Sequence, residues 1–357
     1  MSLRKRIRVL VIDDSAYSRR TIIRMLESSP LIGVVDWARD GQEALRKALE
    51  APVDLITLDL EMPRMDGFTF LRILMARRPT PVLVISGRSG HQDVFKALDL
   101  GAVDFIAKPT PRATPELASI QQELIRKVHA IPRLRIEKVL ERIGAAPALT
   151  RAVAEGPRAH RVVAIGSSTG GPAALMQLFG AFVEPPGCAF VVSQHMPEGF
   201  TGGFAARLDR MSNLSAAEAS PGAMLEPGSI LVAPGGHHLE FEAERGRVLA
   251  RIGERSASDK YSPSIDRMFR SAAKHFGSDL LAVILTGMGD DGCEGALAVK
   301  RAGGNVIVES EETAVIYGMP QQAIRAGAVD AVLPLHEIAP AIQRGFLEPR
   351  AEVETRA

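Results

Sequence analysis

Three polar residues that together could activate a nucleophile lie far apart in the sequence, each just after an apolar run. Ser168 follows the run that begins at Val162, His195 ends CAFVVSQH, and Asp291 follows LLAVIL in a glycine-rich loop. A serine hydroxyl is a weak nucleophile until a base accepts its proton, and a carboxylate can orient a neutral histidine for that task. These three residue types could therefore form an acyl-transfer site.

Spacing alone does not select these three residues from their neighbours. The turn at Gly166 also opens a helix, so it could bind an anion or be only structural. The glycine loop before Asp291 could be a tight turn, or it could bring backbone N–H groups to an oxyanion. The hydroxyls, imidazoles and carboxylates that also fit the pattern are Ser167, Ser193, His237, His238 and Asp290.

A second set of polar residues ends four apolar runs within the first 110 residues. Because the carboxyl ends of parallel strands meet at one sheet edge, we expect these side chains to converge. Three carboxylates held close together favour a divalent cation with oxygen ligands, such as Mg²⁺, and a hydroxyl and an ammonium group join them. The set predicts a phosphoryl-accepting site made from Asp13, Asp14, Asp59, Ser86 and Lys108.

The apolar runs that end in these residues alternate with helical patterns, which predicts an α/β fold with two doubly wound parallel-sheet domains. We predict a flavodoxin-like domain over 1–130 and a Rossmann-like domain over 161–350 with an antiparallel excursion around Ser215–Gly253. Between them, 131–160 shifts to Arg, Ala, Glu and Pro, which indicates a linker with one short helix, Leu134–Ile143. A polar tail follows at 351–357.

Composition excludes several classes of partner. The chain has 357 residues, with Lys+Arg 43 against Asp+Glu 42 and a net charge of +1, which argues against nucleic acid. No apolar run approaches the roughly 18 residues of a membrane span, so we expect no direct membrane insertion. Two cysteines are too few for a disulfide framework, which favours a cytoplasmic location.

The first cluster of motifs resembles the response-regulator receiver domain. The match consists of Asp13-Asp14, LDLEMPRMDG around Asp59, then Ser86 and Lys108-Pro109. The resemblance implies that a histidine kinase phosphorylates Asp59, and that Asp13, Asp14 and Asp59 hold Mg²⁺. It further implies that Ser86 and Lys108 contact the phosphoryl group, and that the rotamer of Phe105 follows the switch.

The second half resembles the catalytic domain of the chemotaxis protein-glutamate methylesterases of the CheB type, in AIGSSTGGP, SQHMPEGFTGGFAARL, SPSIDRMF and AVILTGMGDDG. The resemblance implies Ser168 as nucleophile, His195 as base, Asp291 as orienting carboxylate and the Met288 N–H in the oxyanion hole. The implied reaction is hydrolysis of glutamate γ-methyl esters on chemoreceptors, releasing methanol, with deamidation of glutamines as a second activity. Three residues depart from the usual pattern: Ser167 for alanine, Gly202 for a basic residue and Glu309 for glutamine.

Two hypotheses follow. In the first, the chain is a phosphorylation-activated esterase whose receiver domain shields Ser168, so that deleting residues 1 to about 150 raises basal activity. In the second, it is a non-catalytic regulator whose second domain binds a protein or small anion at the helix that begins near Gly171. A DNA-binding output domain is a weaker third interpretation, because the sequence has no basic recognition helix.

Overall fold

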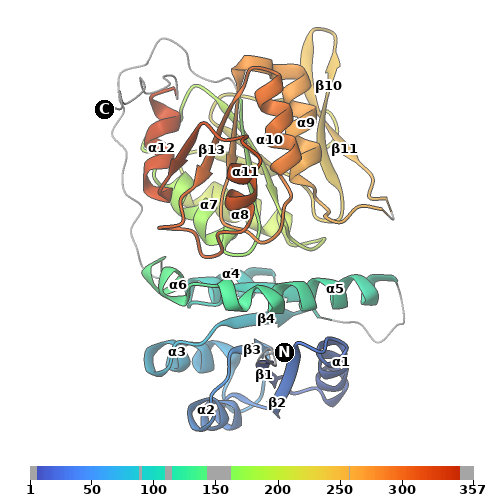
Figure 1. Ribbon diagram of the computed structural model, residues 1–357, viewed down its shortest axis with the longest axis vertical. Coiled ribbons are helices and arrows are strands. Elements are labelled where there is room, and N and C mark those ends of the chain that lie inside the picture. Colours follow the sequence, from blue (N-terminus) through green and yellow to red (C-terminus); the bar gives the residue numbers. More distant parts are fainter. Residues whose placement is uncertain (1–5, 88–90, 109–114, 143–161, 257, 346–357) are drawn as a thin grey trace, which may run out of the picture.

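The computed structural model describes residues 6–87, 91–108, 115–142, 162–256 and 258–345. These residues form two sheet-containing units that are stacked along the long axis of the molecule (Figure 1). Within the described ranges, none of the helices has the length and apolarity needed to cross a bilayer. The predicted tail, 351–357, and most of the predicted linker fall outside these ranges.

The amino-terminal unit has five strands in the flavodoxin-like order β2-β1-β3-β4-β5, with parallel pairing throughout. Strands β1 and β3 are almost entirely buried and apolar, as expected when helices cover a parallel sheet. The strands are β1 (Ile7–Ile12), β2 (Ile32–Ala38), β3 (Leu55–Leu58), β4 (Val82–Ser86) and β5 (Asp104–Ala107). The helices are α1 (Ala16–Glu27), α2 (Gly41–Glu50), α3 (Gly67–Arg77), α4 (His91–Asp99) and α5 (Pro115–Ala130).

The second unit has a seven-stranded sheet in the order β14-β13-β12-β6-β7-β9-β8, and its pairs are also parallel. Its strands are β6 (Val162–Ser167), β7 (Ala189–Gln194), β8 (Ser215–Glu218), β9 (Ser229–Val232), β12 (Leu280–Ile284), β13 (Asn305–Glu309) and β14 (Ala331–Leu333). Its helices are α7 (Gly171–Gly180), α8 (Thr201–Met211), α9 (Ile265–Phe276), η2 (Gly277–Asp279), α10 (Cys293–Arg301), α11 (Met319–Arg325) and α12 (Leu335–Gln343). The two doubly wound sheets confirm the predicted fold class.

The antiparallel excursion is confirmed but is shorter than predicted. Among the described strands, β10 (His238–Glu244) and β11 (Arg247–Gly253) form the antiparallel hairpin, which turns at Arg245-Gly246. The earlier strands β8 and β9 instead extend the main sheet in parallel. The difference arises because strand patterning indicates which face is buried but not which strand will be the partner.

The linker begins with a short 3₁₀ turn, η1 (Ile131–Arg133), and helix α6 (Ile136–Arg142), close to the helix predicted over Leu134–Ile143. Val139 packs with Val315 and Ile316 of the second unit, and Arg135 N donates to the carbonyl of Val315 at 3.1 Å. This first part of the linker therefore lies against the second sheet domain. The domain boundaries themselves stay predictions.

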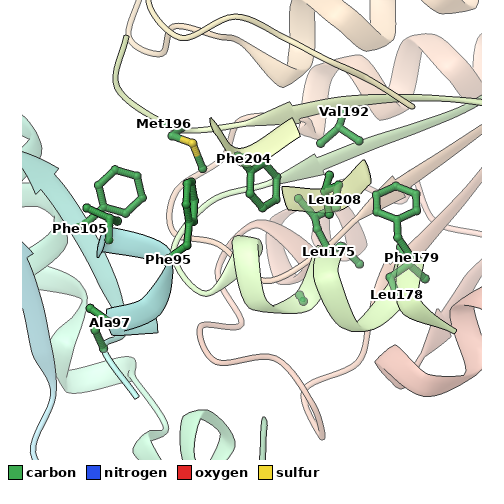
Figure 2. Packing of buried hydrophobic residues seen from close by; sticks show 14 of the residues in the cluster. Phe95, Ala97, Phe105, Leu175, Leu178, Phe179, Val192, Met196, Phe204 and Leu208 are labelled. Carbon is green, nitrogen blue, oxygen red and sulfur yellow. The ribbon is translucent and has the colours of Figure 1, made fainter. Parts of the chain in front are cut away.

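Aromatic side chains join the two units. The Phe95 ring of α4 lies 5.7 Å from the Phe204 ring of α8, and the Phe105 ring of β5 lies 4.8 Å from that of Phe200. Figure 2 shows Phe95 and Phe105 facing Met196 and Phe204 across this contact. In Figure 1, α4, α5 and α6 form the layer nearest the second unit. The apolar core is therefore continuous from one unit to the other.

Candidate active site

Three adjacent strands of the second sheet bring Ser168, His195 and Asp291 together. Ser168 follows β6, His195 follows the neighbouring β7, and Asp291 lies in the loop after β12 on the other side of β6. His195 Nδ1 lies 3.1 Å from Ser168 Oγ, and His195 Nε2 lies 2.8 Å from Asp291 Oδ2. All three residues are buried. The hydroxyl, imidazole and carboxylate form one continuous hydrogen-bonded line.

The donors and acceptors in these hydrogen bonds determine the tautomer of His195. A carboxylate can only accept, so Nε2 carries the proton that is donated to Asp291. Nδ1 is then unprotonated and accepts the hydrogen bond from the Ser168 hydroxyl. In the usual serine triad Nε2 faces the hydroxyl, so the imidazole of this chain is turned the other way. The base competent to take the serine proton is Nδ1.

The amino terminus of α9 holds the Asp291 carboxylate. Backbone N–H groups of Ile265 and Asp266 donate to it at 2.8 and 2.9 Å, and Ser264 Oγ donates at 3.1 Å. Burial by itself would raise the pKa of Asp291, but the hydrogen bonds from His195 and from these N–H groups outweigh burial and lower it. Asp291 therefore stays ionised at neutral pH, as an imidazole partner must.

The second serine of the turn has a different role. Ser167 Oγ donates to Gln194 Oε1 at 2.6 Å, and Gln194 Nε2 donates to the carbonyls of Ser168 and His195 at 3.0 Å each. Gln194 thus ties together the backbones of two of the converging residues. Nothing in the sequence pattern marked Gln194, since its partners lie on two different strand ends.

Four more polar residues that fit the sequence pattern lie in different environments. His238 is fully buried, bonded through Nε2 to Asp259 at 3.0 Å and through Nδ1 to Ser264 N at 3.1 Å. Asp290 accepts from Lys260 at 2.6 Å near the surface. His237 is partly exposed and lies 3.8 Å from Glu254. Ser193 is buried, and its hydroxyl has no hydrogen-bond partner in the described part of the chain.

The glycine loop after β12 lies directly beside Ser168. A Cβ on Gly287 would be 2.9 Å from Ser168 Cβ and 2.3 Å from Met319 Sδ, so this approach requires glycine. The loop is anchored because Thr286 N donates to the buried carboxylate of Glu309 at 2.7 Å. Met288, which follows, packs its side chain into the apolar cluster formed by Val103, Ala130, Val139, Val315 and Ile316.

The acidic cluster of the first unit also forms. Asp13, Asp14 and Asp59 each present a carboxylate oxygen within 4.8 Å of the others. Lys108 Nζ lies 2.5 Å from Asp59 and 3.2 Å from Asp13. Ser86 ends β4, but its side chain lies outside the described residues.

These carboxylates fit a divalent cation. Asp13 Oδ2 is buried, and its contact within the described residues is the 3.2 Å ion pair with Lys108 Nζ. Burial and the neighbouring Asp59 raise the pKa of Asp13 to about 6, and burial also raises the pKa of Asp59. Crowded, desolvated carboxylates of this kind are stabilised when a hard cation binds among them.

The first unit covers the site in the second. Asp104, at the start of β5, accepts a 2.6 Å hydrogen bond from Thr169 Oγ1, next to Ser168. Lys127 of α5 pairs with the same carboxylate at 2.9 Å and donates to the Phe105 carbonyl at 2.7 Å. Ser168, Thr169, Asp104 and Lys127 are all buried where the two units meet. Phe105, the predicted switch aromatic, lies in this interface.

Comparison with known proteins agrees with both halves of the chain. The family model described as CheB methylesterase matches residues 163–342, and the response regulator receiver domain model matches residues 9–118. The chain belongs to the CheB methylesterase family. A Geobacter sulfurreducens relative named protein-glutamate methylesterase/protein-glutamine glutaminase 3 is 48% identical over 93% of this chain and 95% of its own length.

Other relatives of the family agree. A Myxococcus xanthus protein-glutamate methylesterase/protein-glutamine glutaminase is 50% identical, over 96% of this chain and 98% of its own. The crystal structure of the Thermotoga maritima CheB methylesterase catalytic domain is 40% identical and superposes with a TM-score of 0.50, covering 52% of this chain and 98% of that chain. The family predicted from the motifs is therefore confirmed, as is the pairing of a receiver domain with an esterase domain.

Of the three departures, Ser167 is explained by its contact with Gln194, whereas the contact of Glu309 is one that a glutamine oxygen could also accept. Each supplies a buried hydrogen bond, to Gln194 and to the backbone N–H of Thr286 respectively. Gly202 lies in the first turn of α8, where a Cβ would be 3.5 Å from the Glu218 carboxylate. A side chain there would have space, so packing does not explain the glycine.

Proposed function

We propose that this chain hydrolyses glutamate γ-methyl esters on chemoreceptors and deamidates receptor glutamines, under the control of its receiver domain. The observation that carries the proposal is the Ser168, His195 and Asp291 contact in a chain of this family. Both substrates present an acyl carbon, to which an activated serine adds in the same way. A histidine kinase is the proposed phosphodonor, and the cytoplasm, where thiols such as Cys188 and Cys293 remain unpaired, is the proposed location.

The contacts support an acyl-enzyme mechanism. Ser168 Oγ attacks the ester carbonyl carbon as its proton passes to His195 Nδ1, and Asp291 stabilises the imidazolium through Nε2–H. Backbone N–H groups of the glycine loop, including that of Met288, are the proposed donors to the oxyanion. His195 then returns the proton to the leaving oxygen, methanol departs, and water attacks the acyl-serine with Nδ1 as base. With a glutamine substrate the leaving group is ammonia.

The receiver half supplies control. We propose that Asp59 carries the phosphoryl group, with Lys108 and Ser86 as its contacts. Asp13, Asp14 and Asp59 would hold Mg²⁺, which neutralises charge during phosphoryl transfer. A phosphoryl group adds roughly −1.5 to −2 charge next to Lys108, and so changes the face that carries β5. The population would then shift toward an arrangement in which Thr169 and Phe200 lose their receiver contacts and substrate reaches Ser168.

The direct test incubates the full chain with methylated receptor, Mg²⁺ and a small phosphodonor such as acetyl phosphate. We expect methanol in equal amount to the methyl esters lost, and mass spectrometry of the receptor would locate the glutamates that replace them. A reaction without the chain is the control for spontaneous hydrolysis. If the receptor binds but no ester is lost, the chain is the non-catalytic regulator of the second hypothesis.

Replacing Asp59 with asparagine should remove the response to phosphodonor. The amide has the shape of the carboxylate but cannot accept the phosphoryl group, so methanol release should stay at the basal rate whether or not acetyl phosphate is added. Asp54→Asn is a suitable control, because Asp54 lies before β3 and pairs with Arg8. An Asp59→Asn chain that acetyl phosphate still activates would place the phosphorylation elsewhere.

Replacing Phe95 with alanine should raise basal activity without phosphodonor. The side chain is 3% exposed and contacts Phe204 across the interface, and removing a buried ring costs roughly 1.5–3 kcal/mol of contact. We expect the basal rate of methanol release to rise about tenfold. The rate of the wild-type chain with phosphodonor is the expected maximum. Labelling of Asp59 by radioactive acetyl phosphate would show that the receiver is still folded. Unchanged basal activity in a variant that is labelled normally would contradict shielding by this interface.

A further inference from the structure

An aromatic ring lies flat against the imidazole of His195. The Tyr261 ring stacks on it with centroids 4.5 Å apart and planes 8° from parallel. Tyr261 is only 8% exposed, so the two rings meet inside the protein. The sequence pattern gives Tyr261 no role. It lies far from His195 in the sequence, and no motif spacing links the two residues.

The position of the ring depends on the same loop that carries Asp291. Gly289 has φ +100°, and a Cβ there would lie 2.3 Å from Tyr261 Oη, so only glycine leaves room for the phenol. The Tyr261 hydroxyl points to Asp290 Oδ1 at 3.3 Å. The stacked position of the ring therefore depends on the Gly289-Asp290 turn.

The segment after Tyr261 holds the third member of the site. Ser264, Ile265 and Asp266 donate the hydrogen bonds that fix the Asp291 carboxylate. The segment from Tyr261 to Asp266 thus contacts both the ring face of His195 and the carboxylate of Asp291. This arrangement couples the orientation of His195 to that of Asp291.

We propose that Tyr261 is a positioning residue for His195, an inference that rests on the function proposed above. Stacking restricts the tilt of the imidazole, which keeps Nδ1 directed at Ser168 while Nε2 donates to Asp291. The negative face of the phenol ring also favours the imidazolium that forms when His195 accepts the serine proton. The effect therefore belongs to the transition state more than to substrate binding.

The receiver unit contacts this ring as well. Arg126 of α5 places its guanidinium carbon 4.9 Å from the Tyr261 ring centroid. While the two units are docked, this cation engages the same π system that supports the imidazolium. Release of the receiver removes Arg126, whereas Lys260 Nζ, 5.0 Å from the same ring centroid, remains in the second unit. For this reason the test uses the phosphorylated state.

The test compares Tyr261→Phe, Tyr261→Leu and Tyr261→Ala in the full chain with acetyl phosphate and Mg²⁺. The first readout is the rate at which a fluorophosphonate labels Ser168, which reports an activated serine whatever the natural substrate. The second is kcat and KM for methanol release. We expect Tyr261→Phe to stay within about twofold of wild type in both, while the alanine and leucine variants lose roughly three- to tenfold in labelling rate and kcat with little change in KM.

Leucine preserves apolar volume without a ring, so it separates stacking from packing. Wild-type rates in Tyr261→Leu, or equal losses in the phenylalanine and alanine variants, would overturn the proposal, because the first assigns Tyr261 to packing and the second to its hydroxyl. A wild-type chain that labels with the probe but releases no methanol would refute the proposed substrate, while the ranking of labelling rates would still decide the role of Tyr261.

Discussion

Replacing Ser168 with alanine is expected to reduce methanol release by at least about 10³-fold, to a rate close to that without the chain. The physical reason is that no other hydroxyl in the described part of the chain lies at His195 Nδ1. The measurement is methanol release from methylated receptor with phosphodonor and Mg²⁺. Loss of the fluorophosphonate label from the peptide that contains residue 168 gives a second, independent readout.

Ser167→Ala is the matched control for this variant. It removes a neighbouring hydroxyl of the same type, but one that donates to Gln194 and does not contact His195. We expect it to retain most of the activity, with a loss of a few-fold as Gln194 becomes less constrained. If Ser167→Ala were the inactive variant and Ser168→Ala the active one, the two serines would have exchanged roles and the proposed mechanism would be wrong.

Replacing Asp291 with asparagine should lower kcat by roughly 10³- to 10⁴-fold, with KM little changed. The carboxylate accepts from three backbone N–H groups, those of Ile265, Asp266 and Gly292, and also from Ser264 Oγ and from His195 Nε2–H. An amide has one oxygen and two N–H donors, so its NH₂ must face groups that also donate. The clash between donors is removed most easily if the proton of His195 moves from Nε2 to Nδ1. Nδ1 could then no longer accept the Ser168 proton.

Asp290→Asn separates this effect from a general change in loop charge. Asp290 is the adjacent carboxylate, but it pairs with Lys260 at the surface, and this pairing lowers its pKa. The Asp290 oxygen also accepts from the Tyr261 hydroxyl, and an asparagine oxygen can accept that hydrogen bond as well. An exposed ion pair contributes about 1 kcal/mol or less, so we expect activity within about threefold of wild type. Equal losses in the two variants would show that the loop, and not a specific carboxylate, supports the base.

Much of the fold and of the candidate site could be predicted from local patterns. Short apolar runs such as Ile7–Ile12 and Leu280–Leu285 determined the buried parallel strands, because residues buried on both faces must be apolar along their whole length. The polar residue after each run then lies at the carboxyl edge of the sheet. This reasoning located Asp59, Ser168, His195 and Asp291 at the edges where ligands bind.

The sequence by itself therefore determined the two sheet domains, their order and the residue types at each strand end. Spacing left Ser167 and Ser168 open, and the motif resemblance favoured Ser168, which is the serine that contacts His195. Only the tertiary structure decided that Nδ1 is the nitrogen facing it and that Tyr261 stacks on the imidazole. It alone placed Asp104 against Thr169, 65 positions away. The physical reason is that burial of a strand on both faces requires a continuous apolar run, which can be read from the sequence. Contacts between side chains on different elements depend instead on tertiary packing, which no local sequence pattern encodes.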